Sequence, residues 1–169
     1  MTDDKKLTRR TVAKGLTLSF GALALPSVAI TSARAQAKPV KIASIAPLSG
    51  PWARQGQLLR MGSDMAADDI NSNGGIKSLG GAKIEVIYAD AGDSTEKAKN
   101  AAQRLLSDNP DLVGGTGAWL SSFTLAVTEV TERASLPWLT LSYSDAITNR
   151  GFKFVFQTSP TADHQARET

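Results

Sequence analysis

The sequence of 169 residues contains no cysteine and a single histidine, His164. The lack of cysteine excludes disulfide bonds, thiol catalysis and cysteine-ligated metal sites. His164 stands in a polar segment near the end of the chain, so it offers no basis for a Ser-His-Asp triad. No group of residues has the spacing of metal ligands. We therefore predict that the protein is not an enzyme and that it has no metal and no cofactor.

Nucleotide-binding motifs are also missing. The glycines Gly114, Gly115 and Gly117 are not followed by the Lys-Ser/Thr pair of a P-loop. They also lack the third glycine of a dinucleotide fingerprint, and they follow the third predicted strand instead of the first. These glycines are instead expected to form a bend between a strand and a helix.

Charge is unevenly distributed along the chain. The formal net charge is +3, and residues 1–37 account for it with six basic and two acidic side chains. Residues 38–169 hold 13 basic and 14 acidic side chains, so this part is close to neutral. A basic patch for nucleic acid is therefore not predicted.

Residues 1–37 have the layout of a secretory signal. A basic start is followed by an apolar stretch at 15–30 and then by small residues that fit the A-x-A pattern. We expect cleavage near Ala35 or Ala37, and export of the mature protein to the periplasm.

Arg9 and Arg10 favour export by the twin-arginine route. They lie in the segment Thr8–Lys14, which resembles the twin-arginine motif with Val12-Ala13 in place of the usual Phe-Leu. The alternative is an ordinary Sec signal that contains two arginines. The expected partner is therefore the Tat or the Sec export machinery.

The remaining chain alternates strands and helices. This order predicts an α/β fold with a parallel sheet, and right-handed crossovers favour a doubly wound arrangement. Strands are predicted at 40–48, 82–90, 112–113, 136–141 and 152–156, and helices at 53–72, between Asp93 and Asn109, and from Ser121 to Ala134.

Periodicity and capping residues predict how these helices begin and pack. In the first helix, apolar residues at roughly helical spacing are expected to face the core. Asp93, with Glu96 three residues later, is expected to cap the second helix as a capping box, and Ser121 to cap the third. The expected inner stripe of the first helix is Leu58, Met61, Met65, Ala66 and Ile70.

Three polar loops follow strands of the predicted sheet, at 49–52, 116–122 and 142–145. Ligands of open α/β sheets bind outside the carboxyl ends of the strands, so these loops predict a small-molecule cleft. Trp52 and Trp119 stand in two of them. For Trp52, a cap on the core and an aromatic wall of the cleft are both open interpretations. Trp138, inside a strand, is predicted to be core.

Several segments together resemble the type I periplasmic solute-binding proteins, in the branched-chain amino acid (Leu/Ile/Val) class of ABC-transporter receptors. Their order and spacing cover nearly all of residues 40–161. The segments are Pro47–Ala53, Asn73–Ile76 with Gly80-Gly81, Ile84–Asp90, Gly114–Thr124, Glu132–Pro137 and Thr148–Phe156.

The resemblance implies two α/β lobes that close on a ligand, with an amino acid's carboxylate held in the first lobe. Ser121 matches a serine that holds the carboxylate, although a plain N-cap role is the alternative. Ser142 and Tyr143 match loop positions that use backbone groups and a hydroxyl. Trp52 matches an aromatic residue that packs on the ligand, and Trp119 lies where a second one is common.

The chain is much shorter than members of that family. We expect residues 38–161 to form a partial first lobe and residues 162–169 to begin the crossover to a missing second lobe. Alone, such a chain is expected to bind amino acids weakly or not at all. The implied role is the substrate-binding component of an ABC importer, with an inner-membrane permease as partner. A sensory ligand-binding domain of the same fold is the alternative.

Overall fold

The computed structural model describes residues 37–168, so the predicted signal segment, with Arg9 and Arg10, lies outside the described residues up to position 36. Strands and helices alternate along the described chain, as predicted. The strands are β1 (Val40–Ala46), β2 (Ile84–Asp90), β3 (Leu112–Gly117), β4 (Trp138–Thr140) and β5 (Val155–Gln157). The helices are α2 (Ala53–Ser72), α3 (Thr95–Asp108), α4 (Ser121–Arg133) and α5 (Ala162–Arg167), with short 3-10 turns η1 (Gly50–Trp52), η2 (Lys77–Leu79) and η3 (Asp145–Ile147).

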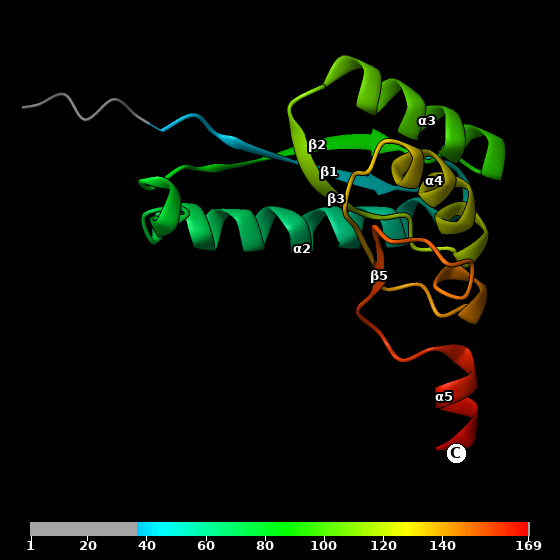
Figure 1. Cartoon of the computed structure of the whole chain (residues 1–169). Coiled ribbons are helices and arrows are strands. Elements are labelled where there is room, and N and C mark those ends of the chain that lie inside the picture. Colours follow the sequence, from blue (N-terminus) through cyan, green and yellow to red (C-terminus); the bar gives the residue numbers. More distant parts are fainter. Residues whose placement is uncertain (1–36, 169) are drawn as a thin grey trace, which may run out of the picture. The chain divides into compact units, whose positions relative to one another are not determined.

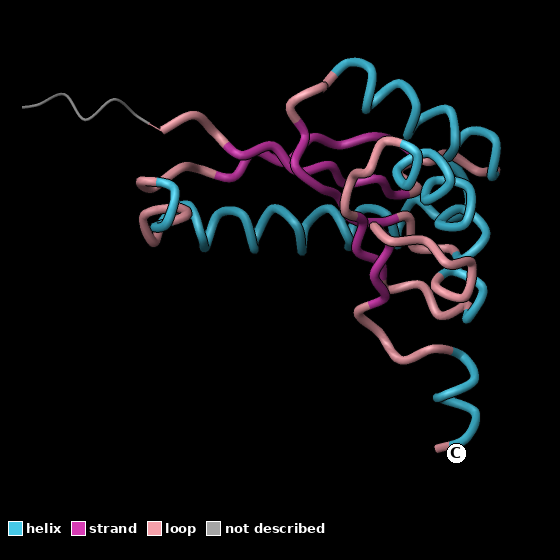
Figure 2. The backbone as a smooth tube through the Cα atoms, viewed as in Figure 1, coloured by secondary structure: helices cyan, strands magenta, loops and turns pink. Residues whose placement is uncertain are grey.

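The five strands form one sheet in the order β2-β1-β3-β4-β5, and every neighbouring pair is parallel. Helix α2 lies on one face, and α3 and α4 lie on the other (Figure 1). Figure 2 shows the strands between these two layers of helix. The predicted doubly wound α/β fold is therefore confirmed. Strand order reverses between β1 and β3, and this switch point is where such sheets bind ligands.

The hydrophobic core lies between the sheet and the helices α3 and α4. Small alanines of α3 and larger residues of α4 pack there against β1 and β4. Trp138 is completely buried, as predicted, and its Nε1 donates a hydrogen bond of 3.1 Å to Gly117 O. Members of this core include Ala43, Ile45, Ala98, Ala102, Phe123, Val127 and Trp138.

The glycine run that the sequence placed in a bend belongs to strand β3. A Cβ atom at Gly115 would lie 2.2 Å from Cζ3 of Trp138, so this strand needs glycine where the indole ring packs. The bend was therefore predicted at the wrong residues. The chain turns after Gly117, in the segment that leads to α4.

The predicted inner stripe of α2 is also wrong. Met61 and Met65 are 58% and 71% exposed, and Leu58, Ala66 and Ile70 are exposed as well. The buried positions are Gly56 and Ala67. Helix α2 lies close to the end of β1 at Gly56, while Leu58 and Ala66 of the predicted stripe line a solvent-accessible groove beside β1 and β3.

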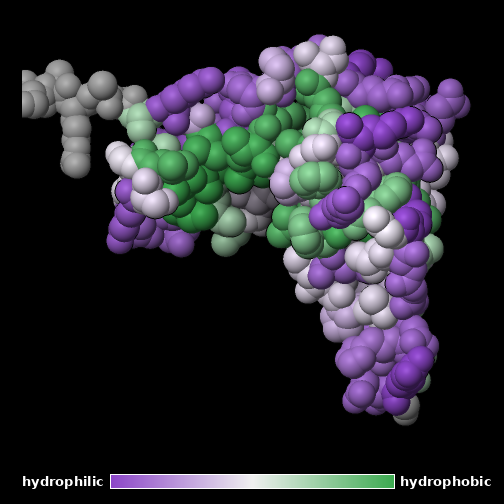
Figure 3. Space-filling view, in the orientation of Figure 1, coloured by the Kyte–Doolittle hydropathy of each residue, from purple (hydrophilic) through white to green (hydrophobic). Residues whose placement is uncertain are grey.

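Part of the sheet face that carries α2 is uncovered. Cross-strand partners Thr116, Leu139 and Phe156 lie side by side on β3, β4 and β5, and Leu139 and Phe156 are about half exposed. A groove of about 320 Å³ runs between this face and Leu58 and Leu59 of α2. Figure 3 shows hydrophobic residues gathered into a continuous region of the visible surface.

The cap of helix α3 differs from the prediction. Ser94, and not Asp93, caps α3, with its hydroxyl accepting from Lys97 N at 3.2 Å. Asp93 instead forms an ion pair of 2.8 Å with Lys97. Serine and aspartate both favour a helix start, so the sequence located the helix but not its capping residue.

None of the helices in the described part is long and apolar enough to cross a membrane.

Candidate functional site

Two loops at the switch point of the sheet bring two tryptophans together. Trp52 ends the turn η1 after β1, and Trp119 stands between β3 and α4. Their ring centroids are 5.4 Å apart, with the planes tilted by 52°. Trp52 is 38% exposed, so part of its ring is accessible to solvent.

The tryptophans border a pocket of about 350 Å³ at the carboxyl ends of β1, β3 and β4. None of its lining side chains is charged. Four of the five site residues predicted from the sequence line it, whereas the sequence did not single out the three leucines, which resemble ordinary core residues. The lining residues are Trp52, Leu59, Trp119, Leu120, Ser121, Leu141 and Tyr143.

Ser142, the fifth predicted site residue, lies buried behind the pocket and is only 1% exposed. Its hydroxyl donates to Trp119 O at 2.8 Å and lies 2.7 Å from Thr124 Oγ1. Thr124 Oγ1 in turn accepts a hydrogen bond of 3.0 Å from Ala118 N. This buried hydroxyl cluster fixes the loop that carries Trp119, and nothing in the sequence marked Thr124 for that role.

Ser121 is the first residue of α4, and the N-cap residue is Leu120. The predicted N-cap role of Ser121 is therefore wrong. Its hydroxyl accepts instead from Ser144 N at 3.3 Å and joins the loop after β4 to the start of α4. The first intrahelical bond reaches Thr124 N, so the preceding amides at this helix end have no partner within the helix. A helix N-terminus with such amides attracts anions.

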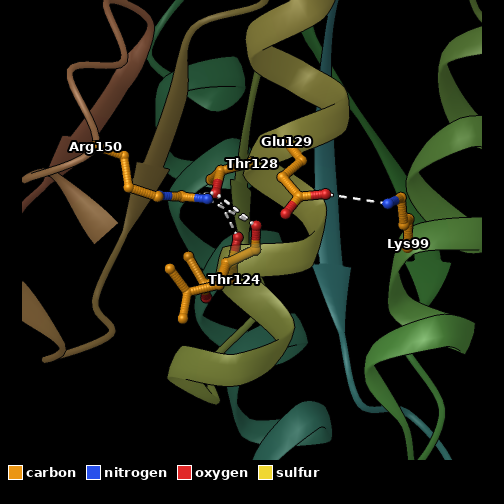
Figure 4. A network of polar contacts seen from close by, with 6 residues as sticks. Lys99, Thr124, Thr128, Glu129 and Arg150 are labelled. Carbon is orange, nitrogen blue, oxygen red and sulfur yellow. Dashed lines mark hydrogen bonds and ion pairs between the residues drawn. The ribbon is translucent and has the colours of Figure 1, made fainter. Parts of the chain in front are cut away.

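The loop after η3 fastens α4 from its outer side (Figure 4). Arg150 donates from Nη1 to Leu125 O at 3.1 Å and from Nη2 to Thr128 Oγ1 at 2.5 Å. Thr128 Oγ1 donates to Thr124 O at 2.6 Å. On the opposite side, Lys99 of α3 pairs with Glu129 at 3.0 Å. Helix α4, whose first residue Ser121 lines the pocket, is therefore held by both neighbours.

Asp90, the last residue of β2, holds the loop that leads to Trp52. Its Oδ1 accepts from the backbone amides of Leu48, Ser49 and Gly92 at 2.8, 3.2 and 2.8 Å. Partial burial alone would raise the pKa of Asp90, but hydrogen bonds from Ser49, Gly92 and Leu48 outweigh it and lower the pKa below its ordinary value. The ionised carboxylate thus stabilises the folded state.

Replacing Asp90 by asparagine is expected to lower the free energy of unfolding by about 1 kcal/mol at pH 7, because three amide donors lose a charged acceptor that is partly exposed. A carboxyl whose pKa is depressed in the folded state stabilises above its unfolded pKa of about 3.9, and loses this effect as pH falls through the folded value. Urea unfolding from pH 7 to pH 3 should therefore show the difference shrinking in acid. Asp68→Asn, at an exposed position of α2, is the control. If Asp90→Asn were less stable than the parent by the same amount at pH 3 as at pH 7, the ionised carboxylate would not be the source of the stabilisation.

Comparison with known proteins identifies the family. The sequence model of the family described as "Periplasmic binding protein" matches residues 39–169. The chain belongs to the periplasmic binding protein family. Proteins of this family bind solutes outside the cytoplasm and are not enzymes. The family assignment confirms the resemblance that the sequence motifs predicted.

Individual periplasmic binding proteins agree with this assignment. The chain is 35% identical over 151 residues to "Leu/Ile/Val-binding protein homolog 8" of Brucella suis. This match covers 87% of the present chain and 35% of the relative. A branched-chain amino acid transporter substrate-binding protein from Streptococcus pneumoniae, solved with isoleucine, has a TM-score of 0.67 and 26% identity over 73% of this chain and 34% of its own. A solute-binding protein of an ABC transporter from R. palustris, solved with 4-hydroxybenzoate, has a TM-score of 0.62 and 25% identity over 73% and 32%. The chain thus spans about a third of the length of these relatives.

Proposed function

We propose that this periplasmic binding protein is the substrate-binding component of an ABC importer, and that it captures an amino acid of the branched-chain type or a related small carboxylate or amide. Its partner would be a permease in the inner membrane. Residues 1–37 would be a signal peptide of the twin-arginine type, removed near Ala35 or Ala37 in the periplasm. The arrangement of the pocket at the switch point supports a small solute, since its lining is apolar with a few polar groups.

The observation that carries the proposal is the position of Ser121 at the N-terminus of α4, beside the tryptophan pair. A hydroxyl and free helix amides suit a carboxylate, and Trp52 and Trp119 suit the apolar part of the same molecule. Isoleucine and 4-hydroxybenzoate, the ligands of two similar structures, share the carboxylate and differ in the apolar part.

Ser121→Ala is expected to weaken carboxylate binding about tenfold, because a hydrogen bond to a charged group is worth about 1.5 kcal/mol or more. NMR titration with L-leucine, L-isoleucine and 4-hydroxybenzoate measures this even when the affinity is low. Ser107→Ala, the same change at an exposed position of α3, should bind like the parent protein. Binding of sugars alone, or equal affinity of both variants, would refute the carboxylate assignment.

A further inference from the structure

The loop Ser142–Ser144, which carries Tyr143 into the pocket, has all three of its carbonyl oxygens occupied. Gln157 Nε2 donates to Ser142 O at 2.9 Å and to Ser144 O at 3.1 Å. Ala162 N donates to Tyr143 O at 2.7 Å. The acceptors of this loop are therefore bound by β5 and α5.

The amides of the same loop are arranged differently. Ser142 N donates to Thr140 Oγ1 at 3.1 Å, and Ser144 N donates to Ser121 Oγ at 3.3 Å. Among the described residues, the N–H of Tyr143 has no hydrogen-bond partner. Tyr143 is 57% exposed and lines the pocket beside Ser121. A residue that lines the pocket thus has a backbone donor without a partner, while the carbonyl oxygens of its loop are engaged.

One peptide unit connects these two observations. The carbonyl of Ser142 and the N–H of Tyr143 belong to the same planar trans peptide, and they point in opposite directions. Binding Ser142 O to Gln157 therefore fixes the direction of the Tyr143 N–H. A rotation of this peptide would exchange the donor for a carbonyl oxygen, which repels an anion.

The orientation of the Gln157 amide is itself determined. Its Oε1 accepts a hydrogen bond of 2.7 Å from Thr148 Oγ1. The amide group of glutamine has one acceptor oxygen and one donor nitrogen, and only the nitrogen can bond to carbonyls. With the oxygen on Thr148, the nitrogen lies at Ser142 O and Ser144 O, as observed.

We propose that Gln157, a half-buried residue at the end of β5, is a positioning residue for anion recognition: it holds the Ser142–Tyr143 peptide so that the N–H faces a bound carboxylate. Gln157 itself does not line the tryptophan pocket. This role rests on the proposed function of that pocket, and it predicts an effect on the carboxylate group of a ligand in particular.

The test compares carboxylate ligands with their neutral amides. We expect Gln157→Met, which keeps the length and removes the amide, to bind L-leucine and 4-hydroxybenzoate about tenfold more weakly, as for loss of one charge-assisted hydrogen bond. Binding of L-leucinamide and 4-hydroxybenzamide should change less than twofold. Gln103→Met, at an exposed position of α3, is the matched control. The affinities come from NMR titrations of the whole chain.

A second pair of variants serves if Gln157→Met does not fold. Thr148→Val removes the hydroxyl that orients Gln157, and Thr148→Ser retains it. Carboxylate affinity should fall several-fold in the first variant and return in the second. Equal losses for carboxylates and amides, or no loss, would overturn the positioning role. A parent protein that binds sugars but none of these carboxylates or amides would overturn the proposed function, and the positioning role with it.

Discussion

Replacing Gly56 by alanine is expected to destabilise the protein by about 3 kcal/mol, although alanine is the better helix former. Gly56 is buried in the first half of α2, where the helix crosses the end of β1. A Cβ atom there would lie 2.0 Å from Pro47 O and 2.5 Å from Pro47 C. Both are backbone atoms, which cannot move aside as a flexible side chain would. The helix or the Pro47 segment must therefore shift.

Gly62→Ala is the matched control for this prediction. Gly62 lies in the same helix, and a Cβ atom at this position would meet nothing within 4 Å. The substitution should raise the free energy of unfolding by about 0.5–1 kcal/mol, since glycine is costly inside a helix. Urea unfolding followed by circular dichroism measures both variants. If both alanines stabilise alike, close packing of α2 on β1 is not a feature of the folded protein.

Gly56→Ala should also disturb the site. Trp52 stands four residues before Gly56, immediately before α2 begins, and its ring contacts Trp119. A shift of the helix start would separate the indole rings, which are 5.4 Å apart between centroids. Tryptophan fluorescence should therefore change in Gly56→Ala and remain unchanged in Gly62→Ala.

The layered architecture could be predicted from the sequence because each element carries its own local signal. The helix at 53–72 matches α2, and its end before Asn73-Gly74-Gly75 follows from glycine's access to left-handed conformations. Alternation of strands with helices then requires parallel pairing. The strand order is not a local property, and it becomes visible only in the assembled sheet.

The wrong predictions for the α2 stripe and for the glycine bend share a physical cause, which is contact between distant segments. The stripe of Leu58, Met61 and Met65 has helical periodicity, yet the face that packs is the one that allows close approach to β1. Gly115 resembles a turn residue, but it belongs to a strand that accommodates the ring of Trp138. Periodicity and composition describe a segment alone and contain no information about its neighbour.

The candidate site divides in the same way. Trp52, Trp119, Ser121 and Tyr143 lie in loops that follow strands, so the topology rule located them, and their placement around one pocket supports their proposed role. Ser142 lies in the same loop as Tyr143 but is turned inward. Thr124 and Gln157 support the loops in part through contacts with Ser142, which lies 18 and 15 positions away, and no pattern in the sequence reveals these contacts.

Thr124→Val is expected to lower the free energy of unfolding by about 2 kcal/mol, although the two side chains have nearly the same shape. Thr124 is completely buried, and its hydroxyl accepts from Ala118 N at 3.0 Å and lies 2.7 Å from Ser142 Oγ. Valine would leave the buried Ala118 N–H without an acceptor, and an unsatisfied buried donor costs about 1–3 kcal/mol. The lost hydrogen bond holds the loop that carries Trp119, so the tryptophan fluorescence emission should shift as well.

Thr131→Val is the control for this prediction. It shows whether the loss of stability in Thr124→Val comes from its hydrogen bonds or from the removal of any buried hydroxyl. Thr131 is equally buried on α4, but its hydroxyl makes only a bond of 3.5 Å to Thr128 O, at the limit of hydrogen-bond distance. Its replacement should therefore change stability by less than about 0.5 kcal/mol and leave the emission unchanged. Equal effects of the two valines in urea unfolding would mean that the cluster of Thr124, Ser142 and Ala118 does not hold the Trp119 loop. A loss confined to Thr124→Val would show that a buried residue outside the pocket sets the position of one of its walls.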